Sequence, residues 1–396
     1  MRICPLCGET TRARTCPTDG SDTFRRVSAS QRQIDANALI DRRYQVTGLL
    51  GKGAFGTVYS AEDRRTAQAL AIKVLAPAFS EGNPDVVRRF VQEAAITSRL
   101  THGNTIRVFD YGQTSGGELF LVMEQLKGRS LQEELAEPGA ERGLGTDESV
   151  RIGSGVLQSL AEAHASGLVH RDLKPANIFL HRIAGRAPVV KVLDFGVVKE
   201  RGKGMTQAGE LVGTPTHMSP EQVREQKIDG RSDLYALGIV LYQCVCGSLP
   251  FADDNLLQVL MMHVSEPPPP LGERSPDTPA ELVAVIHKAL AKEPDDRWPD
   301  ATAMREALLA VPGVRRRSGQ TGQFKTTPRP RKTAAAPRRS PRAPDEVLRT
   351  RREKVRRKRK MHFASTQPVP GREALNGDTV PDASTPADTD DDQQDK

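Results

Sequence analysis

Two short polar stretches in the middle of the chain hold residue types that could move a phosphoryl group. Residues 170–177 read HRDLKPAN, and a second stretch, DFG, begins at Asp194. The carboxylate of Asp172 could accept or orient the proton of an attacking hydroxyl. Asn177 and Asp194 offer the hard oxygen ligands that Mg²⁺ prefers, and the ammonium of Lys174 could neutralise charge on the transferred group. Because phosphoryl transfer depends mostly on positioning and charge stabilisation, these residue types together suit the transfer of a phosphoryl group.

Upstream, three glycines lie between two segments of strand character. Gly51, Gly53 and Gly56 leave backbone amides open to a phosphate, because no side chain obstructs its approach. A dinucleotide-binding turn has the same glycine spacing, but there the glycines open a helix. Residues 57–61 instead continue as a strand, so the sequence predicts a glycine-rich hairpin.

A single lysine interrupts the next apolar strand. Lys73 lies within the sequence AIKV at residues 71–74, where an unpaired ammonium would be costly, so it requires phosphates and a carboxylate. The apolar periodicity of residues 86–100 predicts a helix that carries Glu93. We therefore predict an ion pair between Lys73 and Glu93.

In this order, and over residues 44–309, the landmarks resemble a serine/threonine protein kinase of the bacterial eukaryotic-like (Hanks-type) group. The resemblance implies ATP with Mg²⁺ or Mn²⁺ as cofactors, protein hydroxyls as acceptors, and Asp172, Lys174 and Asn177 as catalytic residues. It implies that Asn177 and Asp194 hold the metal. It also implies a set of nucleotide-binding residues, of which the last two resemble a gatekeeper and a hinge: Leu50, Gly51, Lys52, Gly53, Gly56, Val58, Ala71, Lys73, Glu93, Met123 and Glu124.

The resemblance implies two supports away from the chemistry. Asp233 should brace the catalytic loop from a buried helix, and Arg297 should pair with Glu221, because a buried charge needs such a partner. Lys174 and Thr214 are typical of the branch that phosphorylates serine and threonine rather than tyrosine.

The predicted activation segment contains one departure and one candidate for modification. His217 stands where relatives carry tyrosine, and it adds a group that is expected to titrate near neutrality. Arg171, beside the catalytic aspartate, resembles the arginine of kinases whose activation segment is ordered by a phosphate. Thr206 is the predicted phosphorylation site; the alternative is that it is only a polar loop residue.

The N-terminus carries two knuckles of the same design, CPLCG from Cys4 and CPTDG from Cys16. They resemble a small zinc ribbon in which Asp19 takes the place of a fourth cysteine, so Cys4, Cys7, Cys16 and Asp19 are the predicted Zn²⁺ ligands. The alternative is a metal-free leader without a fold, because about 22 residues cannot build a core.

The remaining two of the five cysteines, Cys244 and Cys246, lie in an apolar run at residues 234–246. That run is too short to span a bilayer, so it predicts a buried helix in which both thiols are packed.

The charge of the chain is concentrated beyond the catalytic region. Residues 315–360 hold 19 Lys and Arg against 3 acids, and residues 361–396 hold 8 acids against 2 basic residues. Few apolar residues accompany these charges, so the tail is predicted to be disordered. Its basic run would attract nucleic acid, an anionic membrane surface or an acidic partner, or be neutralised by the acidic end of the same chain. Charge alone leaves these alternatives open.

The order of elements, strands first and helices later, predicts an α+β fold of two lobes. ATP is expected between a small β-rich N-lobe with one key helix and a larger helical C-lobe. The expected regions are a zinc ribbon (1–22), a linker (23–43), the kinase domain (44–310) and the tail (311–396). Neither a run of 18 apolar residues nor the apolar core of a signal peptide occurs, so a cytoplasmic location is expected.

Two functions from different classes remain open at this point. In the first, the chain is an active kinase that phosphorylates protein substrates and, through self-association, its own activation segment. In the second, it is a catalytically silent scaffold that binds partners through its ribbon and basic tail. The joint presence of the key polar residues favours the enzyme: Lys73, Glu93, Asp172, Asn177 and Asp194.

Overall fold

The computed structural model describes residues 2–5, 7–25, 34–53, 56–76, 84–195 and 215–313. The predicted phosphorylation site Thr206 and the tail beyond residue 313 lie outside these residues. Within the described ranges, no helix combines the length and the apolar character needed to cross a membrane.

The first 25 residues form a small antiparallel sheet with the strand order β2-β1-β3. Its strands are β1 (Arg2–Ile3), β2 (Thr10–Thr11) and β3 (Phe24–Arg25). We call this segment, residues 2–25, the ribbon. Because β3 pairs with β1, the ribbon extends past the predicted boundary at residue 22, and part of the predicted linker belongs to it.

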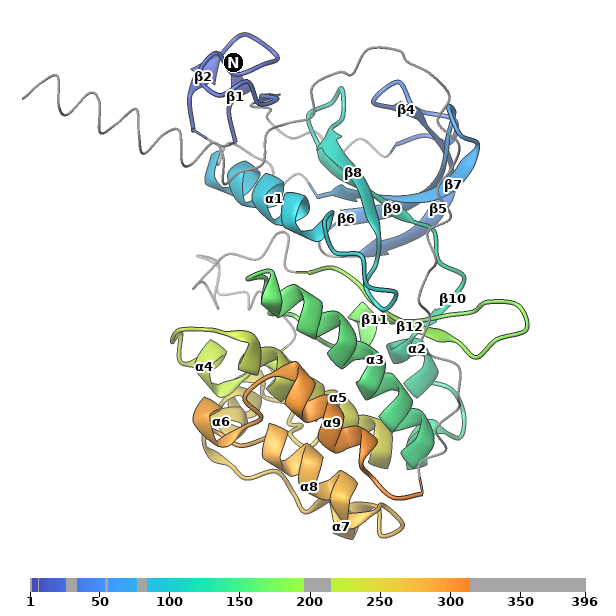
Figure 1. The fold of residues 1–396 in the computed structure, drawn as a ribbon, viewed down its shortest axis with the longest axis vertical. Helices are drawn as coiled ribbons and strands as arrows, with labels where there is room; N and C mark the ends of the chain where they lie inside the picture. Colours follow the sequence, from blue (N-terminus) through green and yellow to red (C-terminus); the bar gives the residue numbers. More distant parts are fainter. Residues whose placement is uncertain are drawn as a thin grey trace, which may run out of the picture. The chain divides into compact units, whose positions relative to one another are not determined.

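A six-stranded antiparallel sheet with the order β4-β5-β6-β7-β9-β8 forms the N-lobe. Its strands are β4 (Leu39–Ile40), β5 (Tyr44–Gly53), β6 (Gly56–Asp63), β7 (Gln68–Leu75), β8 (Val108–Gln113) and β9 (Leu119–Glu124). Strand β4 falls within the predicted linker. Helix α1 (Pro84–Thr97) lies beside β8 in Figure 1 and buries Phe90 and Ala94 against the sheet.

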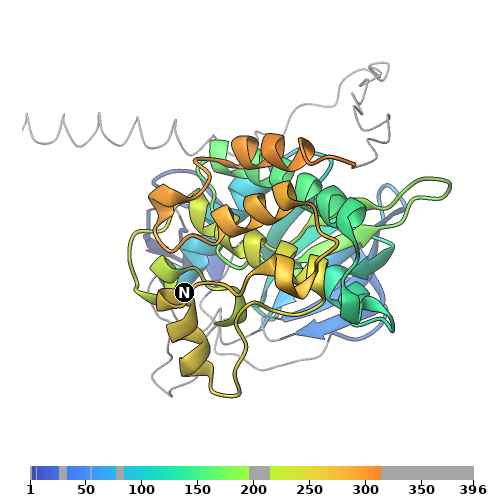
Figure 2. The same ribbon diagram turned by 90° about the horizontal axis from the view of Figure 1, so that it is seen from below.

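The C-lobe is helical, as predicted, and is built around the buried helix α5 (Gly230–Cys246). Asp229 caps the start of this helix by accepting a hydrogen bond from the Arg231 N–H, and the helix ends at Gly247, whose φ of 78° favours glycine. Helix α3 packs against both α5 and α9, and both views show α3 beside α9 (Figures 1 and 2). The helices of this lobe are α2 (Leu131–Leu135), α3 (Thr146–Ala165), α4 (Pro220–Val223), α5, α6 (Leu256–Ser265), α7 (Leu271–Arg274), α8 (Ala280–Ala289) and α9 (Ala301–Leu309).

A third sheet, with the order β10-β11-β12, carries the loops that hold the predicted catalytic residues. Its strands are β10 (Gly128–Ser130), β11 (Ile178–His181) and β12 (Val189–Val192). Strand β11 follows directly after Asn177, and β12 ends two residues before Asp194.

The segment after α1 is fixed to the C-lobe rather than to the sheet. The Thr101 and His102 amides donate to the carboxylate of Glu162 on α3, and Ile106 N donates to Val192 O at 2.9 Å. Asn104 Nδ2 donates to Val190 O at 2.7 Å. These bonds anchor the C-terminal end of α1, so the other end of this helix must be positioned by different contacts.

Candidate active site and metal site

Asp233 braces the loop that carries the predicted catalytic residues. Its carboxylate accepts hydrogen bonds from His170 N and Arg171 N, both at 2.8 Å, and lies 2.7 Å from His164 Nε2. Burial alone would raise the pKa of Asp233, but its bonds to His164 and His170 hold the pKa below its usual range. Arg171 adopts a φ of 63°, which is strained for a residue with a side chain, and the bond to Asp233 helps to hold it there. The predicted bracing role of Asp233 is confirmed.

The predicted catalytic residues Asp172, Lys174 and Asn177 lie together in the loop that Asp233 braces. Asn177 Nδ2 donates to the Asp172 carbonyl at 2.8 Å and lies 3.3 Å from Asp172 Oδ2. Lys174 Nζ lies 3.2 Å from the same Oδ2. Because the amide nitrogen of Asn177 points to Asp172, its Oδ1 is the atom that could hold a cation. The loop therefore brings a carboxylate, a cationic side chain and an amide oxygen together.

The residues before and after Asp194 are both fixed by contacts with His170. Phe195 is fully buried and its ring lies 4.9 Å from that of His170, whose Nε2 is 2.8 Å from Leu193 O. Asp194 has a φ of 50°, and its Oδ2 lies 2.7 Å from Lys73 Nζ. The structure thus brings Lys73 of the N-lobe and Asp194 of the C-lobe into an ion pair.

This pair differs from the one predicted. Among the residues that the structure describes, Lys73 forms its ion pair with Asp194 and not with Glu93, whose Oε1 lies 4.0 Å from Arg171 Nη1. The physical argument for an anion beside Lys73 is correct, but two carboxylates can supply it and Arg171 competes for one of them. The predicted Lys73–Glu93 pair is therefore wrong for this arrangement.

The glycine-rich hairpin forms as predicted, with Gly53 opposite Gly56 between β5 and β6. A Cβ built on Gly51 or Gly53 would meet no atom within 4 Å, which leaves room for a phosphate. Position 56 requires glycine for a different reason, because its φ is +144° and a Cβ there would lie 2.1 Å from Val74 O of the neighbouring strand.

An apolar cluster gathers some of the predicted nucleotide-binding residues. Ala71 and Met123 are buried in it, and Val58 and Leu193 are partly buried and pack against it. Leu50 is 51% exposed on β5, and Lys52 is exposed as well. The structure therefore gathers Val58, Ala71 and Met123 and leaves the side chains of Leu50 and Lys52 in solvent.

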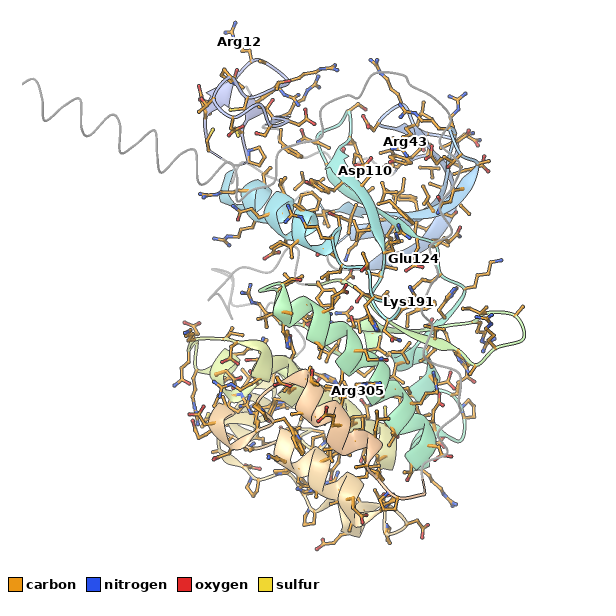
Figure 3. All side chains as sticks on the ribbon, in the orientation of Figure 1. Arg12, Arg43, Asp110, Glu124, Lys191 and Arg305 are labelled. Carbon is orange, nitrogen blue, oxygen red and sulfur yellow. The ribbon has the colours of Figure 1, made fainter. Side chains whose placement is uncertain are left out.

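The side chain of Glu124 has a partner that sequence reasoning missed. Its Oε1 lies 2.5 Å from Lys191 Nζ on β12 and accepts a hydrogen bond from Arg107 N at 2.9 Å (Figure 3). Any nucleotide contact at this position therefore falls to the backbone of Glu124. The sequence did contain a signal for a carboxylate partner, because Lys191 is a lone lysine in an apolar run, as Lys73 is.

The predicted pair of Glu221 with Arg297 is confirmed as a bidentate bond. Arg297 Nη1 lies 2.8 Å from Glu221 Oε1 and Nη2 lies 2.7 Å from Oε2, and both residues are buried. Ser232 Oγ donates to the same carboxylate at 2.5 Å. This pair ties the end of the activation segment to the last part of the C-lobe.

His217 lies near the catalytic loop, and burial lowers its pKa to about 4, with the charge of Lys174 adding to the effect. The expectation that His217 titrates near neutrality is not supported, because the partial burial of its imidazole favours the neutral form. Its Nδ1 lies 2.9 Å from Thr216 Oγ1.

The ribbon brings together Cys4, Cys7, Cys16 and Asp19, with one ligand atom from each lying within 4.8 Å of all the others. Cys7 Sγ lies 3.5 Å from Cys16 Sγ, and Cys4 Sγ lies 3.2 Å from Asp19 Oδ2. A tetrahedral zinc site with bonds of about 2.3 Å to sulfur places its sulfur atoms roughly 3.8 Å apart, so these spacings fit zinc.

The two knuckles also share their backbone geometry. Gly8 N donates to Cys4 O at 3.0 Å, and Gly20 N donates to Cys16 O at 2.9 Å. Both glycines adopt a left-handed φ, of 77° and 73°. Because the turns match, Asp19 in the second knuckle occupies the position that Cys7 has in the first.

Comparison with known proteins agrees with the geometry of the two lobes. The family model described as "Protein kinase domain" matches residues 44–309. The crystal structure of the PknI kinase domain of Mycobacterium tuberculosis matches with a TM-score of 0.57 at 27% identity, covering 70% of this chain and 99% of that one.

Curated relatives include serine/threonine-protein kinases of two bacterial genera. Pkn3 of Myxococcus xanthus is 40% identical over 307 residues, which cover 74% of this chain and 55% of the relative. Pkn1 of the same organism is 42% identical and PknB of Mycobacterium tuberculosis 35% identical, over 67% and 68% of this chain. The chain spans about half or less of the length of these relatives, 38% of Pkn1 and 43% of PknB.

Proposed function

The chain belongs to the protein kinase family, and on that premise we propose that it transfers the γ-phosphoryl group of ATP to serine and threonine hydroxyls of proteins. The observation that carries this proposal is the convergence of Lys73, Asp172, Asn177 and Asp194 from both lobes. All four of these residues are present, so nothing among the described residues favours a catalytically silent scaffold.

Each of these side chains has a task that its contacts support. Asp172, held by Asn177 and Lys174, orients the acceptor hydroxyl and takes its proton. Lys174 then lies beside the oxygen where charge builds. Asn177 Oδ1 and the Asp194 carboxylate would hold Mg²⁺, which supplies neutralisation of the phosphate charge. Lys73 is placed to contact the phosphates from β7.

Phosphate incorporation tests this function. The full chain is incubated with labelled ATP, Mg²⁺ and a generic acceptor protein, alongside Lys73→Met and the control Arg12→Ala, whose side chain is exposed on the ribbon (Figure 3). We expect transfer to serine or threonine by the parent and by Arg12→Ala, and its loss in Lys73→Met. A folded parent that binds ATP but transfers no phosphate would overturn the proposal.

We also propose that the ribbon holds Zn²⁺ through Cys4, Cys7, Cys16 and Asp19. The matched turns and the tetrahedral spacing of the four ligand atoms support this site. Metal analysis of Cys16→Ser tests it, with Cys246→Ser as the control, because Cys246 belongs to α5. We expect one zinc per chain in the parent and the control and a loss in Cys16→Ser. Equal zinc in all three would exclude the site.

Two further proposals concern residues outside the described ranges. Thr206 is proposed as a site of autophosphorylation between two copies of the chain, which Arg171 would read. Unchanged activity of Thr206→Ala, with no phosphate at residue 206 in the parent, would exclude it.

The basic run at residues 351–360 is proposed to bind nucleic acid or an acidic partner. Salt-titrated binding of the parent and of a chain lacking residues 315–396 separates these proposals from neutralisation within the tail. Nucleic-acid binding that survives the deletion would exclude the first.

A further inference from the structure

The ribbon contacts the kinase domain through a buried aromatic side chain. Phe24 on β3 is 6% exposed and belongs to an apolar cluster with Val87, Phe90 and Val91 of helix α1. Leu75 and Leu119 of the N-lobe sheet complete the cluster. The ring of Phe90 in turn meets the ring of Tyr111 edge-on, at 6.4 Å and 82°. A residue from the ribbon therefore covers the N-terminal half of α1.

A pair of hydrogen bonds fixes the register of this contact. Arg25 N donates to Gln113 Oε1 at 2.6 Å, and Gln113 Nε2 donates to Arg25 O at 2.9 Å. Gln113 is the last residue of β8, the strand that lies beside α1. The side chain of Gln113 thus binds the backbone of β3 in both directions and holds Phe24 in place.

The predicted metal ligands lie one step along the sheet from Phe24. Ile3 is the register partner of Phe24, and Cys4 follows Ile3 directly. On the other side, Arg2 Nε donates to Thr23 Oγ1 at 2.8 Å. Strands of two residues are not stable on their own. The position of Phe24 therefore depends on the interactions that hold the two knuckles together.

Helix α1 needs such support. It has 14 residues, a length at which an isolated helix is marginal, so its order depends on packing. Its C-terminal end is followed by the segment anchored to Glu162, whereas Phe24 packs on the opposite end. Glu93 lies between the two supports.

We propose that the metal-loaded ribbon is a built-in activator that orders helix α1, so that phosphoryl transfer depends on zinc at the knuckles. This inference rests on the proposed kinase function and on the proposed zinc site. Loss of the metal releases Phe24 and uncovers the apolar face of α1. Glu93, which lies 4.0 Å from Arg171 of the catalytic loop while the ribbon is docked, then samples many positions, and the loop that carries Asp172 loses this ordered neighbour. The ligand is a divalent zinc ion.

Two measurements on the full chain test the proposal. The first is hydrogen exchange of residues 84–97, which reports order in α1 whether or not the enzyme is active. The second is kcat/KM for phosphate transfer. The variants are Cys16→Ser, which removes a metal ligand, and Phe24→Ala, which keeps the ligands but removes the contact. Arg12→Ala, an exposed ribbon residue, is the control.

We expect faster exchange in α1 and a fall in kcat/KM on the order of tenfold for both Cys16→Ser and Phe24→Ala, within the usual range of coupling between sites. Phe24→Ala should retain its zinc, which separates the contact from the metal. Parent-like exchange and kcat/KM in both variants would overturn the inference and leave the kinase function standing. Increased activity on release of the ribbon would overturn it as well. A parent that transfers no phosphate would overturn the kinase function itself.

Discussion

Lys191 Nζ lies 2.5 Å from Glu124 Oε1, in an ion pair that joins the two lobes. Lys191 also donates to Thr105 O at 3.3 Å and is only 9% exposed, so its ammonium depends on this carboxylate. Strand β9 ends at Glu124, and β12, which carries Lys191, leads directly to Asp194. The pair therefore fixes the predicted metal ligand relative to the predicted hinge.

Removing the carboxylate should leave a buried ammonium without its main partner. Glu124→Ala is expected to lower the free energy of unfolding by about 3 kcal/mol, the lower end for a broken buried pair because the Glu124 side chain is 24% exposed. The measurement is denaturant unfolding followed by circular dichroism. The double variant Glu124→Ala/Lys191→Met should recover much of the loss, because it removes the buried charge too. A double variant as unstable as Glu124→Ala would show that the ion pair is not the cause.

The pair of Arg297 with Glu221 leads to a larger expected effect, because both side chains are almost fully buried. Arg297→Ala should cost about 3–5 kcal/mol of unfolding free energy. Arg224→Ala, which removes the surface pair with Glu293, is the matched control and should cost less than about 1 kcal/mol. Similar losses in the two variants would contradict the structural role of Arg297.

Acid stability should reflect the buried imidazole of His263. Burial, with the nearby charge of Lys292, lowers its pKa to about 3 from the ordinary 6.5. Between these two values the unfolded chain binds a proton that the folded chain does not, so this residue makes stability fall as the pH falls from about 6.5. The slope is about 1.4 kcal/mol per pH unit.

His263→Asn removes this titration, so its unfolding free energy, measured from pH 6.5 to pH 4.5, should fall less steeply than that of the parent. A slope equal to that of the parent would show that His263 protonates as readily in the folded chain.

Two glycines of the hairpin should respond differently to the same substitution. Gly56→Ala places a Cβ 2.1 Å from Val74 O at a φ of +144°, and should cost about 2 kcal/mol or more of stability. Gly51→Ala meets open space and should change stability by less than about 0.5 kcal/mol. Its added methyl group should instead raise the KM for ATP. Thermal unfolding and steady-state kinetics measure both effects, and equal loss of stability in the two variants would contradict the distinction.

Much of this architecture could be predicted from the sequence because its signals are local. The hairpin follows from glycine spacing, and the roles of Asp233 and Arg297 follow from the family resemblance, as the structure confirms. The partner of Lys73 could not be predicted, because the choice between Glu93 and Asp194 depends on distances between lobes. Lys191 could have been found by the argument that was applied to Lys73.

The contact of the ribbon with α1 had no local signal at all. Phe24 resembles any apolar residue in a short strand, and Gln113 is 88 positions away from Arg25. Only the folded chain shows that they meet, and the same is true of the burial that lowers the pKa of His217.

The most direct test of the central claim is the rate of phosphate transfer by Asp172→Asn, measured together with its affinity for Mg²⁺-ATP. Asparagine keeps the shape of the side chain but cannot take the proton of the acceptor hydroxyl, so we expect kcat to fall by roughly 100-fold or more with nucleotide affinity unchanged. A folded Asp172→Asn variant that transfers phosphate at the parental rate would contradict the account.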